Sequence, residues 1–266
     1  MNNPYILQPI RIVKIEQLNT EVKLLTLDYA FPKYNPGQFF MLNLPGIGEA
    51  AFGIMQPICD KNFMEVLVRK VGDFTTKLHE LKKDDKIYLR GPFGNGFPVN
   101  EWEGKNITMI VGGTGIVPIK ALLDYISLHR KYFGDIQLLY GAKTAEEILF
   151  NKELNRCQKF AEVMLTVEKD KSWQGNIGLV TNLITPKTVM PDNSVAVLCG
   201  PPIMYKFVIE KLKKLGFTNK DIFVSLERRM RCGIGKCQHC TCGDKYVCLD
   251  GPVFRYDEAL KFPEGV

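Results

Sequence analysis

The feature that most constrains this chain is a crowd of cysteines near its C-terminus, where five of the eight cysteines fall within 17 residues. Four of them follow the spacing C-x4-C-x2-C-x7-C and are Cys232, Cys237, Cys240 and Cys248. The first three spacings are those of plant-type [2Fe–2S] loops. Because thiolates from one tight loop must converge on a small cluster, the backbone needs residues such as Gly233 and Gly235, which accept positive φ. The spacing therefore predicts a [2Fe–2S] cluster on these four cysteines.

Two other side chains and one other metal compete with this interpretation. Cys242 could replace Cys248 as the fourth ligand, but it lies only two residues beyond Cys240, which favours Cys248. His239 could also bind metal, although a lone histidine is more typical of a neighbouring or solvent-exposed position. Four cysteines can also build a zinc knuckle, but zinc usually takes paired C-x2-4-C units, which disfavours zinc here.

Composition excludes several classes of protein. With 45% hydrophobic and 24% charged residues, the chain is neither disordered nor a coiled coil. No apolar run approaches the roughly 18 residues of a membrane helix, and the N-terminal MNNPYILQPIRIVKIE does not have the pattern of a signal peptide. The net charge of +6 comes from 35 basic residues interspersed among 29 acidic ones. We therefore expect a cytoplasmic protein with no membrane insertion and no nucleic-acid partner.

The first hundred residues have the pattern of an antiparallel β-barrel, because short alternating stretches are separated by turn-forming residues. The expected strands are Arg11–Leu18, Glu21–Tyr29, Gln38–Leu44, Phe63–Val71 and Lys86–Arg90. One helix is expected at Phe74–Leu81, where apolar residues recur on one face. Short strands spaced in this way predict a small barrel over residues 1–100.

From residue 101 onward, strands alternate with helices. The expected strands are Asn106–Val111, Ile136–Tyr140, Ala161–Val167, Val195–Cys199 and Ile222–Ser225. The expected helices are Val117–Lys131, Ala145–Cys157, Gly178–Ile184 and Ile203–Leu215. This alternation predicts a doubly wound parallel sheet over residues 101–226. Residues 227–266 are too few to stand alone without a staple and form a third part, the cluster module. The expected fold class is thus β plus α/β.

Two glycine-containing loops follow strands of the expected parallel sheet. The stretch Ile110–Pro118 carries Gly113, Thr114 and Gly115 between a strand and a helix, where a nucleotide pyrophosphate meets helix N–H groups. The stretch Leu198–Met204 carries Cys199, Gly200 and Pro201 at the end of another strand. Ligands of open α/β sheets bind at the carboxyl ends of the strands, so both loops are expected at one edge. The alternatives are an ordinary strand–helix turn and, for Cys199, a buried small apolar residue.

A third loop lies within the expected barrel. Arg69, Thr75 and Thr76 lie where a strand passes into a helix, and they offer a guanidinium, hydroxyls and amides to a phosphate. An ordinary helix cap is the alternative. The glycine-rich stretch Gly91–Phe97 lies at the expected junction of the first two parts, where a flat cofactor could bind.

Taken together, the sequence resembles the ferredoxin–NADP reductase-like flavoproteins. The stretches that carry the resemblance are VGGTGIVPIKAL, LYGAKT, GPPIM and ERRMRCGIGKCQHC with YVCLDGPVF. It is most similar to the branch that contains electron-transfer subunits of dihydroorotate dehydrogenase, gamma subunits of sulfhydrogenases and the corresponding subunits of anaerobic sulfite reductase. The resemblance implies an NAD(P)H:acceptor oxidoreductase with FAD in the barrel, NAD(H) or NADP(H) in the middle part, and electrons leaving through the cluster.

The resemblance also implies roles for individual residues. Those implied to hold the FAD phosphates are Arg69, Gly72, Thr75 and Thr76. Those implied to approach the nucleotide pyrophosphate are Gly113, Thr114 and Gly115. Cys199, Gly200 and Pro201 are implied to lie beside the nicotinamide, with Cys199 as the catalytic candidate.

One departure from the family pattern concerns the flavin. The family's Arg-x-Tyr/Phe-Ser motif aligns with residues 50–53, so Ala50 lacks the guanidinium and Gly53 lacks the hydroxyl, while Phe52 keeps an aromatic face. Losing a charge-assisted hydrogen bond costs about 1.5–3 kcal/mol. We still expect FAD at Phe52 and Gly53. The alternative is a non-enzymatic iron–sulfur module that binds a partner and has lost flavin.

The acceptor of the electrons is expected to be another protein. No siroheme, nickel or molybdenum site can be built from this sequence, so the partner is expected to be the catalytic subunit of a sulfite reductase or hydrogenase-type complex. The choice between NAD and NADP is open: Lys143 could meet a 2′-phosphate or be a solvated lysine, and the absence of an arginine pair beside it favours NADH.

Overall fold

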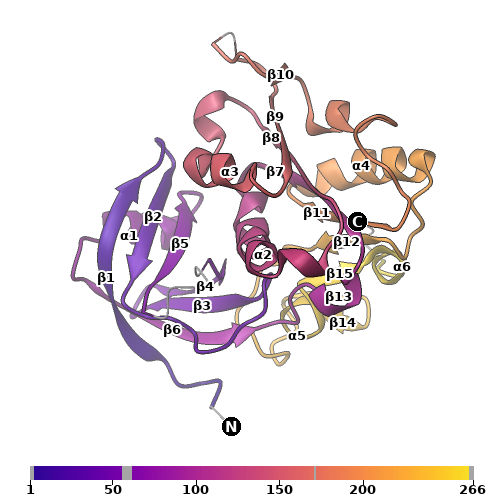
Figure 1. Ribbon diagram of the computed structural model, residues 1–266. Coiled ribbons are helices and arrows are strands. Elements are labelled where there is room, and N and C mark those ends of the chain that lie inside the picture. The colour runs from indigo at the N-terminus through magenta and orange to yellow at the C-terminus, as the bar shows by residue number, and fades with distance from the viewer. Residues whose placement is uncertain (1–2, 56–61, 171, 264–266) are drawn as a thin grey trace. The chain divides into compact units, whose positions relative to one another are not determined.

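The structure, a computed structural model, describes residues 3–55, 62–170 and 172–263, and these form two units (Figure 1). The first unit consists of Met1–Phe97, Glu227–Thr241 and Lys245–Pro252. The second consists of Pro98–Leu226, Cys242–Asp244 and Val253–Val266. No helix among the described residues is long and apolar enough to cross a membrane.

The first unit is built on a six-stranded antiparallel sheet with the strand order β4-β3-β6-β1-β2-β5. Its strands are β1 (Gln8–Gln17), β2 (Val22–Leu27), β3 (Phe39–Leu44), β4 (Gly48–Gly53), β5 (Met64–Arg69) and β6 (Lys86–Phe93). A single bridge between Met55 and Glu65 links the end of β4 to β5, so the two edges of the sheet meet there. Inward-facing side chains such as Ile12, Phe40 and Leu89 fill its core.

The expected antiparallel sheet is confirmed, with one addition to the strands. The sequence pattern predicts no strand over residues 48–53, yet β4 forms there and pairs along its whole length with β3. The expected helix is present as α1 (Asp73–Glu80), whose Leu78 is buried in the core of the sheet.

The second unit contains a seven-stranded sheet with the order β10-β9-β8-β7-β11-β12-β15. Its strands are β7 (Asn106–Gly112), β8 (Ile136–Ala142), β9 (Glu162–Val167), β10 (Asn176–Ile177), β11 (Ser194–Cys199), β12 (Ile222–Ser225) and β15 (Val253–Arg255). The first six are parallel and β15 is antiparallel to β12. β11 is buried at every position, as expected of a central strand covered on both faces.

The helices of this unit are α2 (Ile116–Leu128), α3 (Asn151–Cys157), α4 (Pro202–Leu215) and α6 (Tyr256–Ala259). α2 packs against β7 and β11, and α3 packs against β9. α4 begins with prolines and ends at Gly216 in the left-handed conformation, φ 107°, which glycine adopts without strain.

Three expected elements of this unit differ from the structure. The helix expected over residues 145–157 is interrupted, because Phe150 adopts a left-handed conformation and only Asn151–Cys157 is α-helical. The helix expected over residues 178–184 is one short 3₁₀ turn, Val180–Leu183. β12, expected to be the last strand, is followed in the sheet by β15, which comes from the C-terminal stretch.

Candidate cofactor sites

The cysteine loop belongs to the first unit and brings its thiols together in two pairs. Cys232 and Cys237 lie within hydrogen-bonding reach of each other, and so do Cys240 and Cys248. Cys240 and Cys248 are each only 1% exposed, whereas Cys237 is exposed. Cys248 lies in a single helical turn, α5 (Val247–Asp250), which follows the short strands β13 (Thr241–Cys242) and β14 (Lys245–Tyr246). The loop thus supplies two partly buried sulfur pairs.

Backbone N–H groups point at these sulfurs. The amide of Gly235 donates to Cys248 Sγ at 3.1 Å, and the amides of Lys236 and Cys237 donate to Cys232 Sγ at 3.3 and 3.4 Å. The amide of Cys248 donates to Cys240 Sγ at 3.5 Å. Such donors stabilise negative charge on sulfur, which is what a bound thiolate carries.

The loop geometry depends on glycine at two positions. Gly233 and Gly235 have φ of +70° and +71°, a region that other residues rarely adopt. A Cβ on Gly233 would lie 3.0 Å from Met41 Cγ and 3.2 Å from a ring carbon of Phe93. The loop is therefore seated closely on β3 and β6.

The two pairs differ in their acid–base character. Burial opposes ionisation of Cys232, but the amides of Ile234, Cys237 and Lys236 outweigh it and lower the pKa of its thiol to about 6. Burial, reinforced by the neighbouring thiol of Cys240, raises the pKa of Cys248 to about 12. The backbone therefore prepares Cys232 as a thiolate before any metal arrives.

The competing ligands lie as follows. Cys242 is buried, at 1% exposure, and His239 is exposed. Among residues 3–55, 62–170 and 172–263, no three histidine, cysteine, aspartate or glutamate side chains are arranged to hold one metal ion. The four predicted ligands are thus placed as two pairs of thiols.

In the second unit, the two predicted nucleotide loops lie side by side. β7 and β11 are adjacent parallel strands in which Val111 pairs with Cys199, so both loops leave the carboxyl edge of the sheet together. A Cβ on Gly115 would overlap the Cys199 carbonyl group, and a Cβ on Gly200 would lie 3.0 Å from the Gly112 nitrogen. The backbones therefore touch, and glycine is required on both sides.

Other predicted residues of this edge differ in exposure. Gly113 has φ +54° with open space where a Cβ would be, and Thr114 is half-buried beside it. Pro201 is exposed, whereas the Cys199 side chain is only 1% exposed. The edge thus presents mainly backbone.

Tyr205, which the sequence pattern does not single out, fixes the second loop. Its hydroxyl accepts a hydrogen bond from the Gly200 amide at 3.3 Å and donates one to the Ser225 carbonyl at 2.5 Å. The side chain is 2% exposed. One buried hydroxyl therefore ties the loop after β11 to the end of β12.

The residues predicted to hold FAD lie around the start of α1. The Thr75 hydroxyl accepts from the Val71 and Gly72 amides and donates to the Gly72 carbonyl, so it caps the helix. Arg69 is paired through two nitrogens with Glu21, at 3.1 and 3.0 Å. A Cβ on Gly72 would meet nothing within 4 Å, so no contact within the protein requires glycine there.

The aromatic face predicted for the flavin is also in this region. Phe52 on β4 packs between Phe40 and Phe74, with ring centroids 6.3 and 6.4 Å away, and remains half-buried. Gly53, which follows it, is half-buried too, and Thr76 lies in the first turn of α1 with its amide donating to the Gly72 carbonyl. The structure therefore gathers these residues within the first unit.

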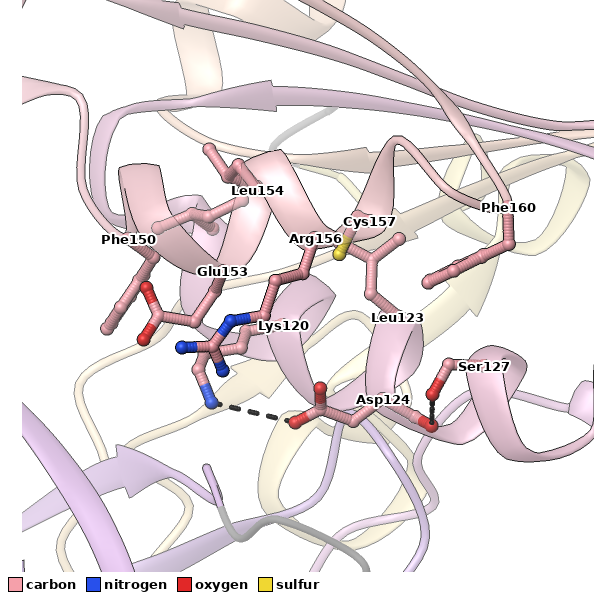
Figure 2. A pocket seen from close by; sticks show the side chains of 11 residues that line it. Lys120, Leu123, Asp124, Ser127, Phe150, Glu153, Leu154, Arg156, Cys157 and Phe160 are labelled. Atoms are coloured by element: carbon pink, nitrogen blue, oxygen red, sulfur yellow. Dashed lines mark hydrogen bonds and ion pairs between the residues drawn. The ribbon is translucent and has the colours of Figure 1, made fainter.

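A cavity of about 210 Å³ lies elsewhere, between α2 and α3 of the second unit (Figure 2). Lys120 and Asp124, with Nζ and Oδ2 3.5 Å apart, line it together with Cys157. Burial, with the Asp124 carboxylate, raises the pKa of Cys157 to about 11, so this thiol stays protonated at neutral pH. None of the predicted cofactor residues lines the cavity.

The two sheets and their loops define an oxidoreductase of the ferredoxin–NADP reductase-like fold. Residues 109–210 match the oxidoreductase NAD-binding domain, and residues 227–260 match the iron–sulfur cluster binding domain of dihydroorotate dehydrogenase B. A structure of the NADH-dependent reduced ferredoxin–NADP oxidoreductase is similar, with TM-score 0.76 and 25% identity over 98% of this chain and 94% of that one. The FAD- and NADP-bound ferredoxin NADP⁺ reductase of Neisseria gonorrhoeae shares the fold, with TM-score 0.70 and 18% identity over 82% of this chain and 97% of that one.

Relatives of known sequence identify the family. Sulfhydrogenase 1 subunit gamma of Pyrococcus furiosus is 38% identical, and the match covers 98% of this chain and 95% of the relative. The probable dihydroorotate dehydrogenase B (NAD(+)) electron transfer subunit of Methanocaldococcus jannaschii is 37% identical over 95% of this chain and 90% of the relative. The chain belongs to the family of these gamma and electron transfer subunits.

Proposed function

We propose that this protein is an electron-transfer subunit that oxidises NADH and passes the electrons through FAD and a [2Fe–2S] cluster to a separate catalytic subunit. The observation that carries the proposal is the arrangement of four thiols in two pairs under backbone N–H donors. In a [2Fe–2S] cluster each iron takes two protein ligands, so two thiol pairs fit this cluster. Zinc would instead need four thiols around one ion.

The four ligands in this proposal are Cys232, Cys237, Cys240 and Cys248. The first pair would hold one iron and the second pair the other. When bound, such a cluster supplies one-electron transfer at a site close to the protein surface. The exposed position of Cys237 supports an exit toward a partner at that side of the loop.

FAD is proposed to bind in the first unit. Gly72, Thr75, Thr76 and Arg69 would meet its phosphates at the start of α1, and Phe52 with Gly53 would flank its ring. The open space beside Gly72 supports this, because it leaves room for close approach of a ligand to the backbone. Bound flavin accepts a two-electron donor and releases single electrons.

The nicotinamide nucleotide is proposed to bind at the paired loops of the second unit. Gly113, Thr114 and Gly115 would approach the pyrophosphate, because they lead into the N-terminus of α2. Gly200 and Pro201 would lie beside the nicotinamide. For Cys199 we propose a backbone role, since its carbonyl rather than its buried side chain lies against Gly115. Lys143 is exposed just beyond β8 with no arginine next to it in sequence, which supports NADH.

The partner is proposed to be the catalytic subunit of a sulfhydrogenase-type or anaerobic sulfite reductase-type complex in the cytoplasm. The relatives named above are themselves subunits of complexes. We retain three functional parts for the chain: residues 1–100 for FAD, 101–226 for the nucleotide and 227–266 for the cluster.

The test is an absorption spectrum of the purified protein, with iron, zinc and flavin contents measured on the same sample. We expect about two irons per chain, flavin bands, and bleaching of those bands when NADH is added without air. A cluster spectrum with no flavin would support a non-enzymatic iron–sulfur module instead. Zinc without iron would contradict the cluster itself.

A further inference from the structure

Arg90 is the most deeply buried arginine that the proposed function leaves without a role. It lies on β6, paired in register with Met41 of β3, near the middle of the first unit's sheet. Its side chain is 9% exposed. A charge buried to this degree costs several kcal/mol unless it is paired and fully hydrogen-bonded. Its partners therefore reveal what it is held there to do.

One side of the guanidinium is neutralised by Glu49. The Nε and Nη2 atoms of Arg90 each donate to one carboxylate oxygen of Glu49 at 2.7 Å, and the Glu49 side chain is 18% exposed. Glu49 lies on β4, one residue before Ala50. The pair therefore anchors the guanidinium to the strand that carries the proposed flavin residues.

The other side of the guanidinium points at the cysteine loop. Nη1 donates to the carbonyl oxygen of Cys232 at 2.6 Å, and Nη2 reaches the carbonyl of Arg231 at 3.4 Å. The guanidinium also lies 5.4 Å from the centroid of the Phe93 ring, the same ring that Gly233 approaches. The loop is thus attached to the sheet at two neighbouring points, by a charged donor at Cys232 and by packing at Gly233.

From this geometry we propose that Arg90 is a positioning residue for the cluster: it fixes the backbone of the first ligand, Cys232, and Glu49 holds it in place. Only the planar fork of arginine can satisfy a carboxylate through two nitrogens and a carbonyl through the third. Its positive charge, one residue's backbone away from a ligand sulfur, also stabilises negative charge at the cluster. Glu49 offsets part of that charge. This inference rests on the proposed function, since it requires a cluster on Cys232.

The principal test replaces both charges, because removing a whole buried pair is often tolerated while removing one partner is not. The double variant Arg90→Met/Glu49→Met is compared with Arg11→Met/Asp28→Asn, which removes an exposed arginine–aspartate pair of the same unit. Thermal unfolding by circular dichroism and flavin content report on the fold. Loss of the cluster's visible absorbance to a chelator, and the EPR spectrum of the reduced protein, report on the cluster.

We expect the double variant to lose its cluster roughly tenfold faster or more, with a broadened EPR signal, because a charge-assisted bond to Cys232 is gone. The Arg11→Met/Asp28→Asn protein should behave as wild type. Equal rates and spectra in the two double variants would overturn the positioning role. Wild-type protein without iron would overturn the proposed function as well, so the two failures are distinguishable.

Two single variants carry the test if the double variant does not fold. Arg90→Lys keeps the charge but not the fork, so cluster loss should still be faster while the midpoint potential stays near that of wild type. Glu49→Gln leaves the positive charge less offset, so the potential should shift to more positive values. An unchanged cluster-loss rate in Arg90→Lys, or a potential in Glu49→Gln that is unchanged or more negative, would contradict the proposal.

Discussion

The backbone of Gly115 touches that of Cys199, so closely that a Cβ on Gly115 would overlap the Cys199 carbonyl group. The two residues are far apart in sequence, yet the adjacent parallel strands β7 and β11 deliver them to the same edge. A relationship of this kind constrains both loops at once, because neither can move away without breaking the edge where the nucleotide is proposed to bind.

Replacing Gly115 with alanine tests this contact. The φ of Gly115 is −59°, so alanine is conformationally allowed and the cost is purely one of space. We expect unfolding free energy to fall by about 1–3 kcal/mol, as for other overpacking substitutions, and NADH to bind more weakly. Urea denaturation and NADH titration measure the two effects. A variant as stable as wild type would show that the loops separate easily.

Gly72→Ala is the matched case with free space. Its extended φ of −171° and the open surroundings of its Cβ position predict a stability change within about 0.5 kcal/mol. If FAD phosphates approach this backbone as proposed, the methyl group should nevertheless weaken FAD binding. Fluorescence titration of the flavin-free protein measures the affinity. Unaltered FAD affinity would remove Gly72 from the proposed site.

Tyr205→Phe removes the hydroxyl that joins the Gly200 amide to the Ser225 carbonyl and leaves two buried backbone groups without that partner. The expected loss of stability is about 1–3 kcal/mol. Tyr132→Phe is the control, since Tyr132 is 45% exposed in the same unit, and it should change stability by less than about 0.5 kcal/mol. Equal effects in chemical denaturation would contradict the bridging role of Tyr205.

The fourth cluster ligand is decided by two serine substitutions. Cys248 and Cys242 are equally buried, so a general packing effect would be similar in both. We expect Cys248→Ser to destroy or alter the cluster, because its thiol pairs with that of Cys240, whereas Cys242→Ser should leave the EPR signal nearly intact. The opposite pattern would transfer the ligand role to Cys242.

The alkaline limb of stability should depend on Tyr140. Burial raises the pKa of Tyr140 to about 12, while the unfolded residue ionises near 10. Its stabilising contribution is therefore complete below about pH 10 and is lost as the pH rises toward 12, by up to roughly 2–3 kcal/mol. Unfolding free energies of wild type and Tyr140→Phe, measured from pH 8 to 12, should converge as the pH rises. Parallel curves would contradict the assignment.

Much of the fold can be predicted from local patterns, and the failures have physical causes. Strand β4 escapes prediction because its sequence GEAAFG has small residues of low β propensity and no alternation, so its pairing with β3 decides its structure. The helix over residues 145–157 is predicted too long because nothing in the pattern marks Phe150 as left-handed. Strand β15 escapes prediction because its partner, β12, is distant in sequence.

The same division holds for the candidate sites. The meeting of the loops that carry Gly115 and Cys199 can be expected, since parallel strands end at one edge. The roles of Arg90 and Glu49 cannot, because each is an ordinary charged residue in its own strand and only the folded sheet brings them to Cys232. Tyr205 gives no signal either, as a tyrosine on a helix usually contributes to the core.

The antiparallel strand β15 makes the cluster segment an insertion into the second unit's sheet, since β12 precedes the segment and β15 follows it. Cutting the chain after Leu226 would strip β12 of its outer partner and leave a row of unpaired amides and carbonyls, a surface that promotes aggregation. Transplanting the segment into another reductase requires two splice points and a recipient sheet that lacks its own outermost strand. Exchange of such modules between proteins is thus limited by sheet architecture rather than by the chemistry of the cysteines.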